Sequence, residues 1–263
     1  MKILRNKYLM FFLGFLFLIG VWFLVSAIVD LNNMIFPSPY ATFKRMFELL
    51  GQGVTYKYLG FSVLRLIIGF AVSFVLAFLL GILVNNSEPL YNFFTPIITF
   101  LKAAPTATFV FVFLVLFGGR NAPAWVVILM TFPILYESVV SALRSTPVEM
   151  LEASKIDGAG RFKTLIRVQI PLGIPFITLG LLSTFGMAFK VEIMAEIITG
   201  ITKGGIGTMI KISNLLDGTD LTNMFAYSLI AIILVLIVSI AALIVKGKIA
   251  SQKGEKTIKS SVN

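Results

Sequence analysis

The chain has 263 residues, of which 58% are hydrophobic and only 13% charged, and a composition this apolar excludes a soluble globular protein. Its net charge of +10 does not indicate a nucleic-acid partner, because the basic residues flank apolar segments as they do in membrane proteins. There is neither cysteine nor histidine, which excludes disulfides, thiol chemistry, histidine acid–base catalysis and zinc sites built from these residues.

Six segments are long and apolar enough to cross a bilayer, which takes about 20 residues in a helix. The first has no charged residue and no small-residue cleavage site behind it, so it predicts a retained membrane helix rather than a signal peptide. The six segments are 8–29, 59–84, 93–117, 122–143, 174–194 and 225–245, and the third is interrupted by Lys102 and Pro105. They predict an all-α, polytopic membrane protein with about six transmembrane helices in the lipid bilayer.

Two connecting segments have features of their own. Residues 36–39 read Phe-Pro-Ser-Pro, a rigid extended stretch, after which Ser38 or Thr42 is suited to cap a short interfacial helix over 43–50. The glycines of 204–207 lack the lysine of a phosphate-binding loop and predict a flexible turn. The Gly-x4-Gly-Lys-[Ser/Thr] pattern of an ATP-binding loop occurs nowhere, so the chain is not expected to hydrolyse ATP.

The distribution of lysine and arginine predicts the orientation of the chain. If the N-terminus is cytoplasmic, thirteen of these residues lie in cytoplasmic segments and six in segments on the opposite side of the membrane. This bias follows the positive-inside rule. Both termini and the segment 144–172 are therefore expected in the cytoplasm.

The segment 144–172 is a polar island between the fourth and fifth apolar segments. Residues 148–153 favour a helix, an Asp-Gly pair interrupts it, and a second helix is expected over 161–169, ending before Pro171. Connections between helices are usually only a few residues long, and a long one with organised helices often has a role of its own. We therefore expect a helix–turn–helix that lies across the cytoplasmic membrane face.

The island also contains a spaced motif. It reads Glu152-Ala153-Ser154, three residues, Gly158, nine residues and Val168-Gln169-Ile170-Pro171. This arrangement resembles the EAA motif of ATP-binding-cassette (ABC) importer permeases, which reads EAA, three residues, G, nine residues and I-x-L-P. Ser154 replaces the third alanine, and Val168 and Ile170 replace isoleucine and leucine, while the spacing is fully kept.

Three further segments resemble the branch of that family that carries nitrate, taurine and aliphatic sulfonates, which also includes carriers of thiamine precursors. Residues 36–39 are similar to its PSP segment after the first span, and 62–70 to its S-x-x-R-x-x-x-G-F opening of the second span. Ala195-Glu196 followed by Gly205-Ile206-Gly207 resembles its A-E…G-x-G segment. The resemblance covers roughly residues 35–245.

The resemblance implies the type I ABC importer permease fold, in the cytoplasmic (inner) membrane of a bacterium, and a set of partners. These are a second permease copy in a homodimer, a dimer of cytoplasmic ABC ATPases, and an extracellular or periplasmic solute-binding protein. ATP and magnesium belong to the ATPase, so no cofactor and no enzyme activity are expected in this chain. Residues 59–245 are expected to form the core permease, 1–58 an N-terminal helix with an interfacial segment, and 246–263 a basic cytoplasmic tail.

The resemblance also implies that five residues of the island couple the permease to the ATPase. Glu152 offers a carboxylate to a polar or cationic group of that partner. Ala153 and Ser154 are small enough to allow close helix approach. Asp157 and Gly158 form a sharp turn, in which a Cβ at Gly158 would be expected to clash.

Charged residues inside the spans are candidates for a translocation pathway. A charge within the bilayer costs about 2.5–3.5 kcal/mol on insertion scales and is usually paired or functional. Arg65, early in the second span, is expected to face protein rather than lipid. Lys102 is expected either to meet Glu137 of the fourth span or to line the pathway.

Three charged residues near the end of the fifth span are candidates for a gate: Lys190, Glu192 and Glu196. On a helix, Glu192 and Glu196 share a face, whereas Lys190 diverges from them by about 200° and 240° at 100° per residue. The two carboxylates are therefore expected to meet cationic or hydrogen-bonding groups of another span, the partner permease or the binding protein, but not Lys190.

Other functional classes stay open at this point. An ion-coupled secondary transporter would use the membrane carboxylates and need no site for an ATPase. A membrane-embedded enzyme would have to work without histidine or cysteine, and an energy-coupling-factor transmembrane component would show paired Ala-Arg-Gly coupling motifs, which this chain lacks. For the substrate, the basic residues favour a small organic anion such as a sulfonate, and a thiamine or riboflavin precursor is the alternative.

Overall fold

The computed structural model describes residues 7–29, 36–200, 204–216, 220–237, 239–240 and 244, and every regular element within these ranges is helical. The predicted tail over 246–263 lies outside them. The helices are α1 (Lys7–Ile28), α2 (Pro39–Leu50), α3 (Gly53–Asn85), α4 (Glu88–Ala103), α5 (Thr106–Arg144), α6 (Val148–Ile156), α7 (Arg161–Thr164), α8 (Ile170–Thr199), α9 (Ile206–Leu216) and a final helix over Thr222–Ile237, with a π-helical turn over Leu165–Gln169. The predicted all-α class is confirmed for this part of the chain.

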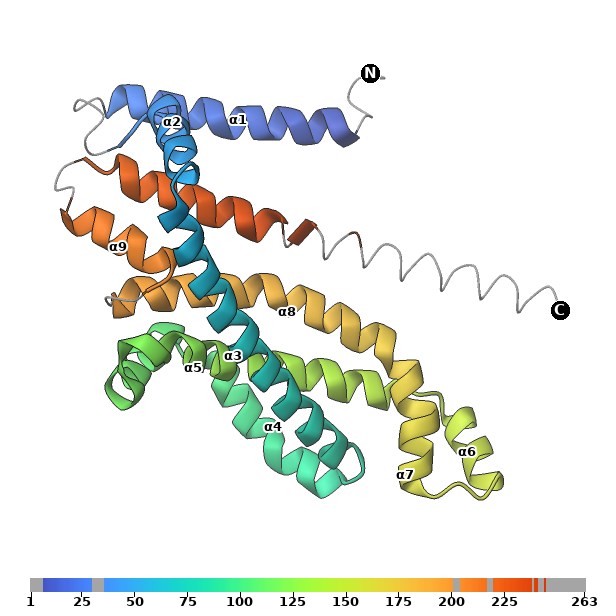
Figure 1. The fold of residues 1–263 in the computed structure, drawn as a ribbon. Helices are drawn as coiled ribbons and strands as arrows, with labels where there is room; N and C mark the ends of the chain where they lie inside the picture. Colours follow the sequence, from blue (N-terminus) through green and yellow to red (C-terminus); the bar gives the residue numbers. More distant parts are fainter. Residues whose placement is uncertain are drawn as a thin grey trace.

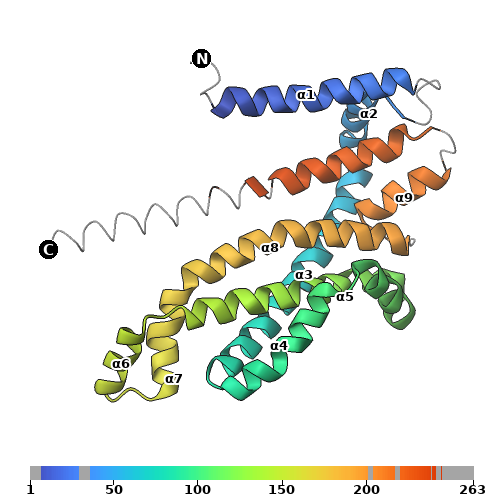
Figure 2. The same cartoon turned by 180° about the vertical axis from the view of Figure 1, so that it is seen from behind.

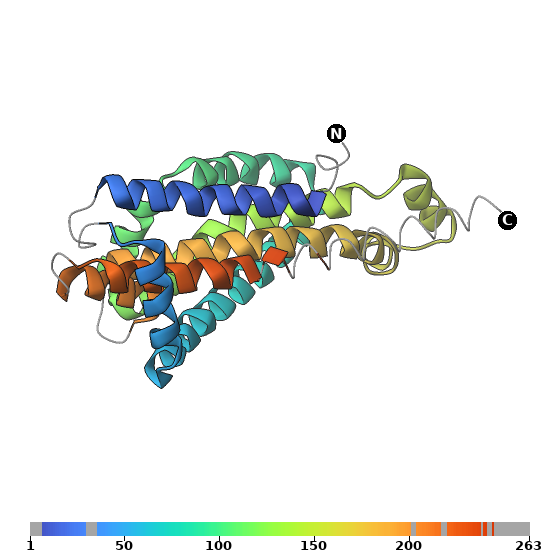
Figure 3. The same cartoon turned by 90° about the horizontal axis from the view of Figure 1, so that it is seen from above.

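The long helices run lengthwise through the molecule, and α3 crosses them obliquely (Figures 1 and 3). The short helices α6 and α7 protrude at one end, and α2 and α9 lie at the other (Figures 1 and 2). We call these the α6–α7 end and the α9 end. The helix α5 packs chiefly against α8 and α3, and these three form the centre of the bundle.

Four described helices are long and apolar enough to cross a membrane. They are Leu9–Ile28, Gly53–Asn85, Thr106–Arg144 and Arg161–Thr199. They contain the second, fourth and fifth predicted spans and nearly all of the first, and these four are confirmed as helices. The sixth predicted span begins within the final helix, Thr222–Ile237, and runs on into residues of which only some are described.

The third predicted span, 93–117, is interrupted at Pro105, as predicted, and is divided between two helices. Helix α4 ends before Ala104, which is extended with φ −73° and ψ 137°, and α5 begins after Pro105. Proline pushes the residue before it out of the helical region and has no N–H with which to continue a helix. Within α5, Gly118 adopts φ 70° and ψ 158°, so α5 consists of two helical parts that meet at a sharp bend (Figure 2).

The second helix of the polar island is predicted to end before Pro171. In the structure it continues past this proline into α8. In the π turn Leu165–Gln169, the N–H of Ile170 donates to the carbonyl of Leu165, one residue further back than in an α-helix. In a regular α-helix the proline ring clashes with the carbonyl four residues before it, and the wider turn relieves this contact. One continuous helix, Arg161–Thr199, therefore links the island to the bundle.

Small residues let the three central helices approach one another closely. A Cβ at Gly69 of α3 would lie 2.9 Å from a backbone oxygen of α5, and one at Gly180 of α8 would lie 2.5 Å from the Oγ of Ser138 in α5. A buried hydrogen bond of 2.7 Å from Thr131 Oγ1 to Ser73 Oγ joins α3 and α5. Close backbone contact of this kind is the usual way in which helices associate within membranes.

The α9 end is built from segments far apart in the sequence. Helix α2 begins four residues before the predicted start because Ser38, one of the two predicted caps, accepts a 3.3 Å hydrogen bond from a backbone N–H. Met46 and Leu49 of α2 are buried in a cluster with α9 and the final helix. Helix α2 is therefore part of the packed bundle rather than an isolated surface helix.

Polar contacts also fix the start of the final helix. Asp220 Oδ1 accepts a 2.9 Å hydrogen bond from the N–H of Thr222, and Arg45 Nε donates to Oδ1 of Asn223 at 2.6 Å. The hydrogen bonds from Thr222, together with the charge of Arg45, hold the pKa of Asp220 below its ordinary value. These contacts join α2 to the first turn of the final helix.

Candidate functional site

The predicted coupling residues lie on a projecting arm, which we define as residues 148–169 and call the α6–α7 arm (Figure 1). Glu152, Ala153, Asp157 and Gly158 are all exposed on it. The structure therefore places these four residues at the surface of the arm, at one end of the bundle.

Ser154 lies elsewhere in the arm. It is buried, and its Oγ lies 2.8 Å from the Oγ1 of Thr164, so its hydroxyl joins α6 to α7. The small side chain does allow close helix approach, but to a helix of its own chain. This corrects the prediction that Ser154 lies at the surface that meets a partner.

Gly158 has a conformational role. Its φ is +70°, a left-handed backbone conformation that favours glycine, and nothing lies within 4 Å of an added Cβ. The predicted clash is therefore wrong, and the backbone angle is the reason for glycine. The turn is closed by two 3.0 Å hydrogen bonds, from Gly158 N–H to Lys155 O and from Ala159 N–H to Ser154 O.

A groove of about 570 Å³ separates α6 from α7 and the π turn. Ala153 and Asp157 line it from α6 and the turn, and Lys163 and Arg167 line it from the second helix. The arm thus presents one carboxylate, Asp157, on one side of a groove and two basic groups on the other, which suits a protein surface of mixed charge.

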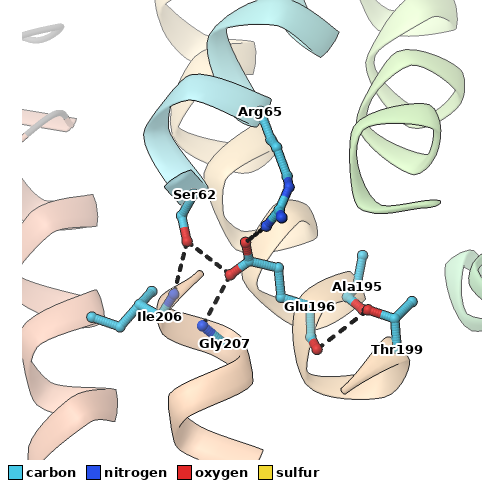
Figure 4. A network of polar contacts seen from close by, with 7 residues as sticks. All are labelled: Ser62, Arg65, Ala195, Glu196, Thr199, Ile206 and Gly207. Carbon is cyan, nitrogen blue, oxygen red and sulfur yellow. Dashed lines mark hydrogen bonds and ion pairs between the residues drawn. The ribbon is translucent and has the colours of Figure 1, made fainter. Parts of the chain in front are cut away.

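The second predicted site, near the end of α8, is a buried polar network (Figure 4). Glu196 is 1% exposed, and its carboxylate lies 2.8 Å from Arg65 Nη1 and accepts hydrogen bonds from Ser62 Oγ at 2.8 Å and Gly207 N–H at 3.0 Å. Ser62 Oγ in turn accepts a 2.9 Å hydrogen bond from the N–H of Ile206. The network joins α3, α8 and the first turn of α9, whose free N–H groups and positive dipole end favour a carboxylate.

Glycines are required where α9 begins. A Cβ at Gly205 would overlap the Ser62 hydroxyl and the Glu196 carboxylate, and one at Gly207 would lie 2.5 Å from the carbonyl oxygen of Ile193. Both glycines are buried. The flexible turn predicted over 204–207 is therefore wrong, because the chain is packed there against the network.

The network confirms that Glu196 meets polar groups of another span. It overturns the alternative that Glu196 meets the binding protein. Glu196 meets groups of another span, and Arg65 faces protein, as predicted. However, Glu196 lies within α8 and is buried, so a binding protein has no direct access to it. Glu192, one turn earlier, is fully buried, and in the described part of the chain neither of its carboxylate oxygens has a hydrogen-bond partner.

Lys102 and Glu137 form the predicted ion pair between α4 and α5. Lys102 Nζ lies 2.9 Å and 2.7 Å from the two carboxylate oxygens of Glu137, and both side chains are nearly half exposed. The first of the two alternatives for Lys102 is therefore confirmed. The pair does not contact the network around Glu196.

The ion pair belongs to a polar face that the sequence analysis missed. We call it the polar stripe, and it consists of Tyr91, Thr95, Thr99, Lys102, Glu137, Ser138, Ser141 and Ser145. Two cavities of about 470 and 70 Å³ are lined by the residues of this stripe other than Lys102 and share Glu137 and Ser141. The signal that predicts such a face is the recurrence of hydroxyl residues three and four apart on α4 and α5.

The remaining gate candidate, Lys190, lies apart from both sites. It is exposed on α8 and borders a separate cavity between α8, α9 and the final helix. It does not contact Glu192 or Glu196, as predicted from the helix geometry. Within the described residues there is also no cluster of three or more histidine, cysteine, aspartate or glutamate residues that could hold a metal ion.

Comparison with known proteins identifies related sequences. The family described as binding-protein-dependent transport system inner membrane component matches residues 73–251. A protein named as an aliphatic sulfonates transport permease, SsuC of Bacillus subtilis, is 22% identical over 195 residues, which cover 73% of this chain and 70% of SsuC. The riboflavin transport system permease protein RibX of Chloroflexus aurantiacus is 28% identical over 189 residues, 71% of this chain and 69% of RibX.

Similarity to a third relative is confined to part of its length. The glycine betaine/proline betaine permease protein ProW of Escherichia coli is 28% identical over 132 residues, which make up 50% of this chain but only 36% of ProW. The chain thus spans little more than a third of the length of that relative.

Solved structures share the fold. A chain of the MetNI methionine ABC transporter in an inward-facing conformation superposes with a TM-score of 0.63 at 18% identity, over 74% of this chain and 95% of that one. A chain of a bacterial ABC transporter that imports alginate superposes with a TM-score of 0.58 at 17% identity, over 92% of this chain and 96% of that one. The helical bundle with its projecting arm is therefore the type I ABC importer permease fold, and the chain belongs to the family of binding-protein-dependent transport system inner membrane components, the permeases of ABC transporters.

Proposed function

We propose that this permease forms the membrane pathway of an ATP-driven importer, which receives a small solute from a binding protein and is driven by a separate ATPase. The α6–α7 arm is the observation that carries the proposal. It projects from the bundle, exposes Glu152 and Asp157, and keeps the EAA spacing. The continuous helix Arg161–Thr199 gives a rigid connection along which a displacement of the arm reaches the α9 end.

In this proposal the α6–α7 end is cytoplasmic and contacts a dimer of ABC ATPases. ATP and magnesium bind to those subunits, and this chain has neither a cofactor nor a catalytic site. The basic groove residues Lys163 and Arg167 support the orientation, since positive charge is favoured on the cytoplasmic side. A second copy of the chain completes a homodimer, and the binding protein docks at the α9 end. Residues 59–245 form the core permease between an N-terminal segment and a basic tail.

The polar stripe supports a solute pathway along α4 and α5. Ionisable residues within membrane spans almost always face the interior of a bundle or a water-filled cavity, because contact with hydrocarbon is costly. Lys102, Glu137 and the neighbouring hydroxyls are exposed on one copy of the chain. We assign this face to the path between two copies, where water and solute replace lipid.

The substrate is a small organic solute. We propose either a sulfonate-like organic anion or a heterocycle such as a thiamine or riboflavin precursor. The names of two relatives, which refer to aliphatic sulfonates and to riboflavin, support these two classes.

Substitution of Gly158 tests the coupling role of the arm. A β-branched residue at φ +70° is strained, and the left-handed conformation costs an L-residue about 1–2 kcal/mol. In the transporter assembled with its ATPase and binding protein, Gly158→Val should lower binding-protein-stimulated ATP hydrolysis by roughly tenfold, the factor that corresponds to about 1.4 kcal/mol. Insertion into the membrane should persist, because the turn lies outside the bundle.

A matched control lies two residues away. Gly160 has an ordinary φ of −66° and open space around an added Cβ, so Gly160→Val should leave the stimulated hydrolysis unchanged. Full stimulation in Gly158→Val, with normal import, would remove the arm from the coupling mechanism and with it the proposed function.

A further inference from the structure

A third cavity lies apart from the arm, the network and the polar stripe. Its volume is about 630 Å³, and it opens between α8, α9 and the final helix. Its walls are mostly aliphatic, with Ile193, Met194 and Ile197 of α8 on one side and Val235 and Leu236 of the final helix on the other. A concave, largely apolar site of this volume falls within the range of small-molecule sites, about 300–1,000 Å³.

Lys190 is the charged residue of this cavity. It forms no ion pair or hydrogen bond with another residue in the described ranges. The nearest carboxylate along the helix, Glu192, is buried on another side of α8. An ammonium group inside a membrane-spanning helix is costly without a counter-charge, so the cavity has a local excess of positive charge that an anion would neutralise.

A second polar group, the hydroxyl of Ser239, contacts α8 one helical turn from Lys190. Gly186 is one turn before Lys190, and an added Cβ there would lie 3.2 Å from the Oγ of Ser239. Ser239 therefore faces α8 beside Lys190, and together they form a polar end of the cavity. The other lining serine, Ser228, donates a hydrogen bond to the carbonyl of Met224. It lies about 16 Å from Ser239, towards the start of the final helix.

We infer that this cavity binds an amphiphilic organic anion, with its anionic group at Lys190 and Ser239 and its apolar body along the aliphatic walls. The inference rests on the proposed function, because it takes the ligand to belong to the solute class that the transporter carries, bound at a site beside the path along α4 and α5. Lys190 lies about 14 Å along α8 from the helix end at Thr199. A membrane lipid keeps its headgroup at the interface, so its phosphate would not reach this depth, whereas a free organic anion is not anchored there.

Binding of hexanesulfonate to the complete transporter in lipid nanodiscs tests the inference by calorimetry. Hexanesulfonate should bind saturably. Methanesulfonate, which lacks the apolar body, and hexyltrimethylammonium, which reverses the charge, should each bind at least tenfold more weakly.

Variants of this chain separate the charge from the apolar wall. Lys190→Met should weaken hexanesulfonate binding at least tenfold, and Lys190→Arg should retain it, since it restores the charge in a chain of similar length. Ile232→Trp should also weaken binding, because it fills the cavity without removing the charge. Lys57→Met, which changes an exposed lysine of α3 outside the cavity, should bind as the unaltered chain does.

Three results would overturn the inference: no saturable binding of hexanesulfonate, equal binding by Lys190→Met, or binding in detergent that disappears in nanodiscs because lipid fills the cavity. These results are independent of the proposed function. If hexanesulfonate does not bind while Gly158→Val still lowers the stimulated ATP hydrolysis, only the assignment of this cavity falls.

Discussion

At the residue scale, Glu192 and Glu196 show how two identical side chains on one helix face meet different surroundings. Glu196 has the Arg65 guanidinium, a serine hydroxyl and a backbone N–H around its carboxylate. Glu192 is equally buried, but its oxygens have no hydrogen-bond partner in the described structure. A buried carboxylate without partners opposes folding, whereas one in a complete network supports it.

Neutralisation of each glutamate should therefore have a different effect on stability. Glu196→Gln should lower the free energy of unfolding by about 3 kcal/mol, because removing one partner of a buried ion pair leaves the other charge without its counter-charge. Glu192→Gln should not lower it. Unfolding in mixed micelles with increasing dodecyl sulfate measures both, and equal losses would show that the network does not distinguish the two residues.

The variant Glu196→Gln also separates gating from assembly. Because Glu196 fixes the start of α9 far from the α6–α7 arm, Glu196→Gln should alter import and the release of the binding protein while the ATPase still co-purifies. Normal import with unchanged release kinetics in this variant would contradict a role of Glu196 in the gate.

The glycines of α3 and α9 provide a second prediction at this scale. Gly207→Ala should lower the free energy of unfolding by about 1–3 kcal/mol, because its Cβ would meet the Ile193 carbonyl and the Cβ of Glu196. Gly60→Ala should raise it by about 0.5–1 kcal/mol, since Gly60 lies within α3 with open space around it. Thermal unfolding of the two variants in one detergent compares them, and equal midpoints would contradict the tight packing around α9.

At the scale of elements, the α6–α7 arm is held together by a contact between its two helices. The hydroxyls of Ser154 and Thr164 meet in its interior, and the left-handed turn at Gly158 brings the helices side by side. The arm can transmit a force to α8 only if this contact keeps it rigid. The EAA motif has alanine in place of Ser154, so the contact requires a small side chain more than it requires a hydroxyl.

Substitution of Ser154 tests this requirement. Ser154→Ala should cost about 1 kcal/mol through one lost hydrogen bond and should retain stimulated ATP hydrolysis. Ser154→Leu should separate the two helices and reduce the stimulation as strongly as Gly158→Val does. Lys155→Leu, at the exposed neighbouring position, is the control and should leave it unchanged. Full coupling in Ser154→Leu would contradict a rigid arm.

At the scale of the whole molecule, the two ends of the bundle differ in chemistry. The α6–α7 end carries the groove with basic residues and the exposed arm, and the α9 end carries the buried network and the packed helix α2. This asymmetry fits the proposed importer, in which an ATPase binds on one side of the membrane and a binding protein delivers the solute on the other.

Cysteine labelling tests the orientation directly, because the chain has no cysteine of its own. Lys163→Cys on the arm should resist a membrane-impermeant thiol reagent in intact cells and react after the cells are opened. Gln52→Cys, exposed at the start of α3 near the α9 end, should react in intact cells. The reverse pattern would place the arm outside the cell and overturn the proposed orientation.

Properties that depend on neighbouring residues followed from the sequence by itself. Hydropathy predicts the apolar helices, because each satisfies its own backbone hydrogen bonds and needs only a run of apolar side chains to lie in lipid. The spacing within 152–171 identified the arm, and helix periodicity predicted that Lys190 does not share a face with Glu192 or Glu196. The pairing of Lys102 with Glu137 was one of two alternatives that the cost of buried charge allowed.

Only the tertiary structure decided the features that depend on residues far apart in the chain. The hydrogen bond between Ser62 and the N–H of Ile206 spans 144 positions, and no local spacing predicts it. This bond, with Glu196, turned a glycine-rich segment that looked flexible into the packed start of α9. Likewise, whether the helix passes Pro171 or stops there depended on a π turn, and whether a carboxylate gains partners depended on which helices surround it. The sequence determined which segments are helices, and the packing of those helices determined which of their polar groups meet.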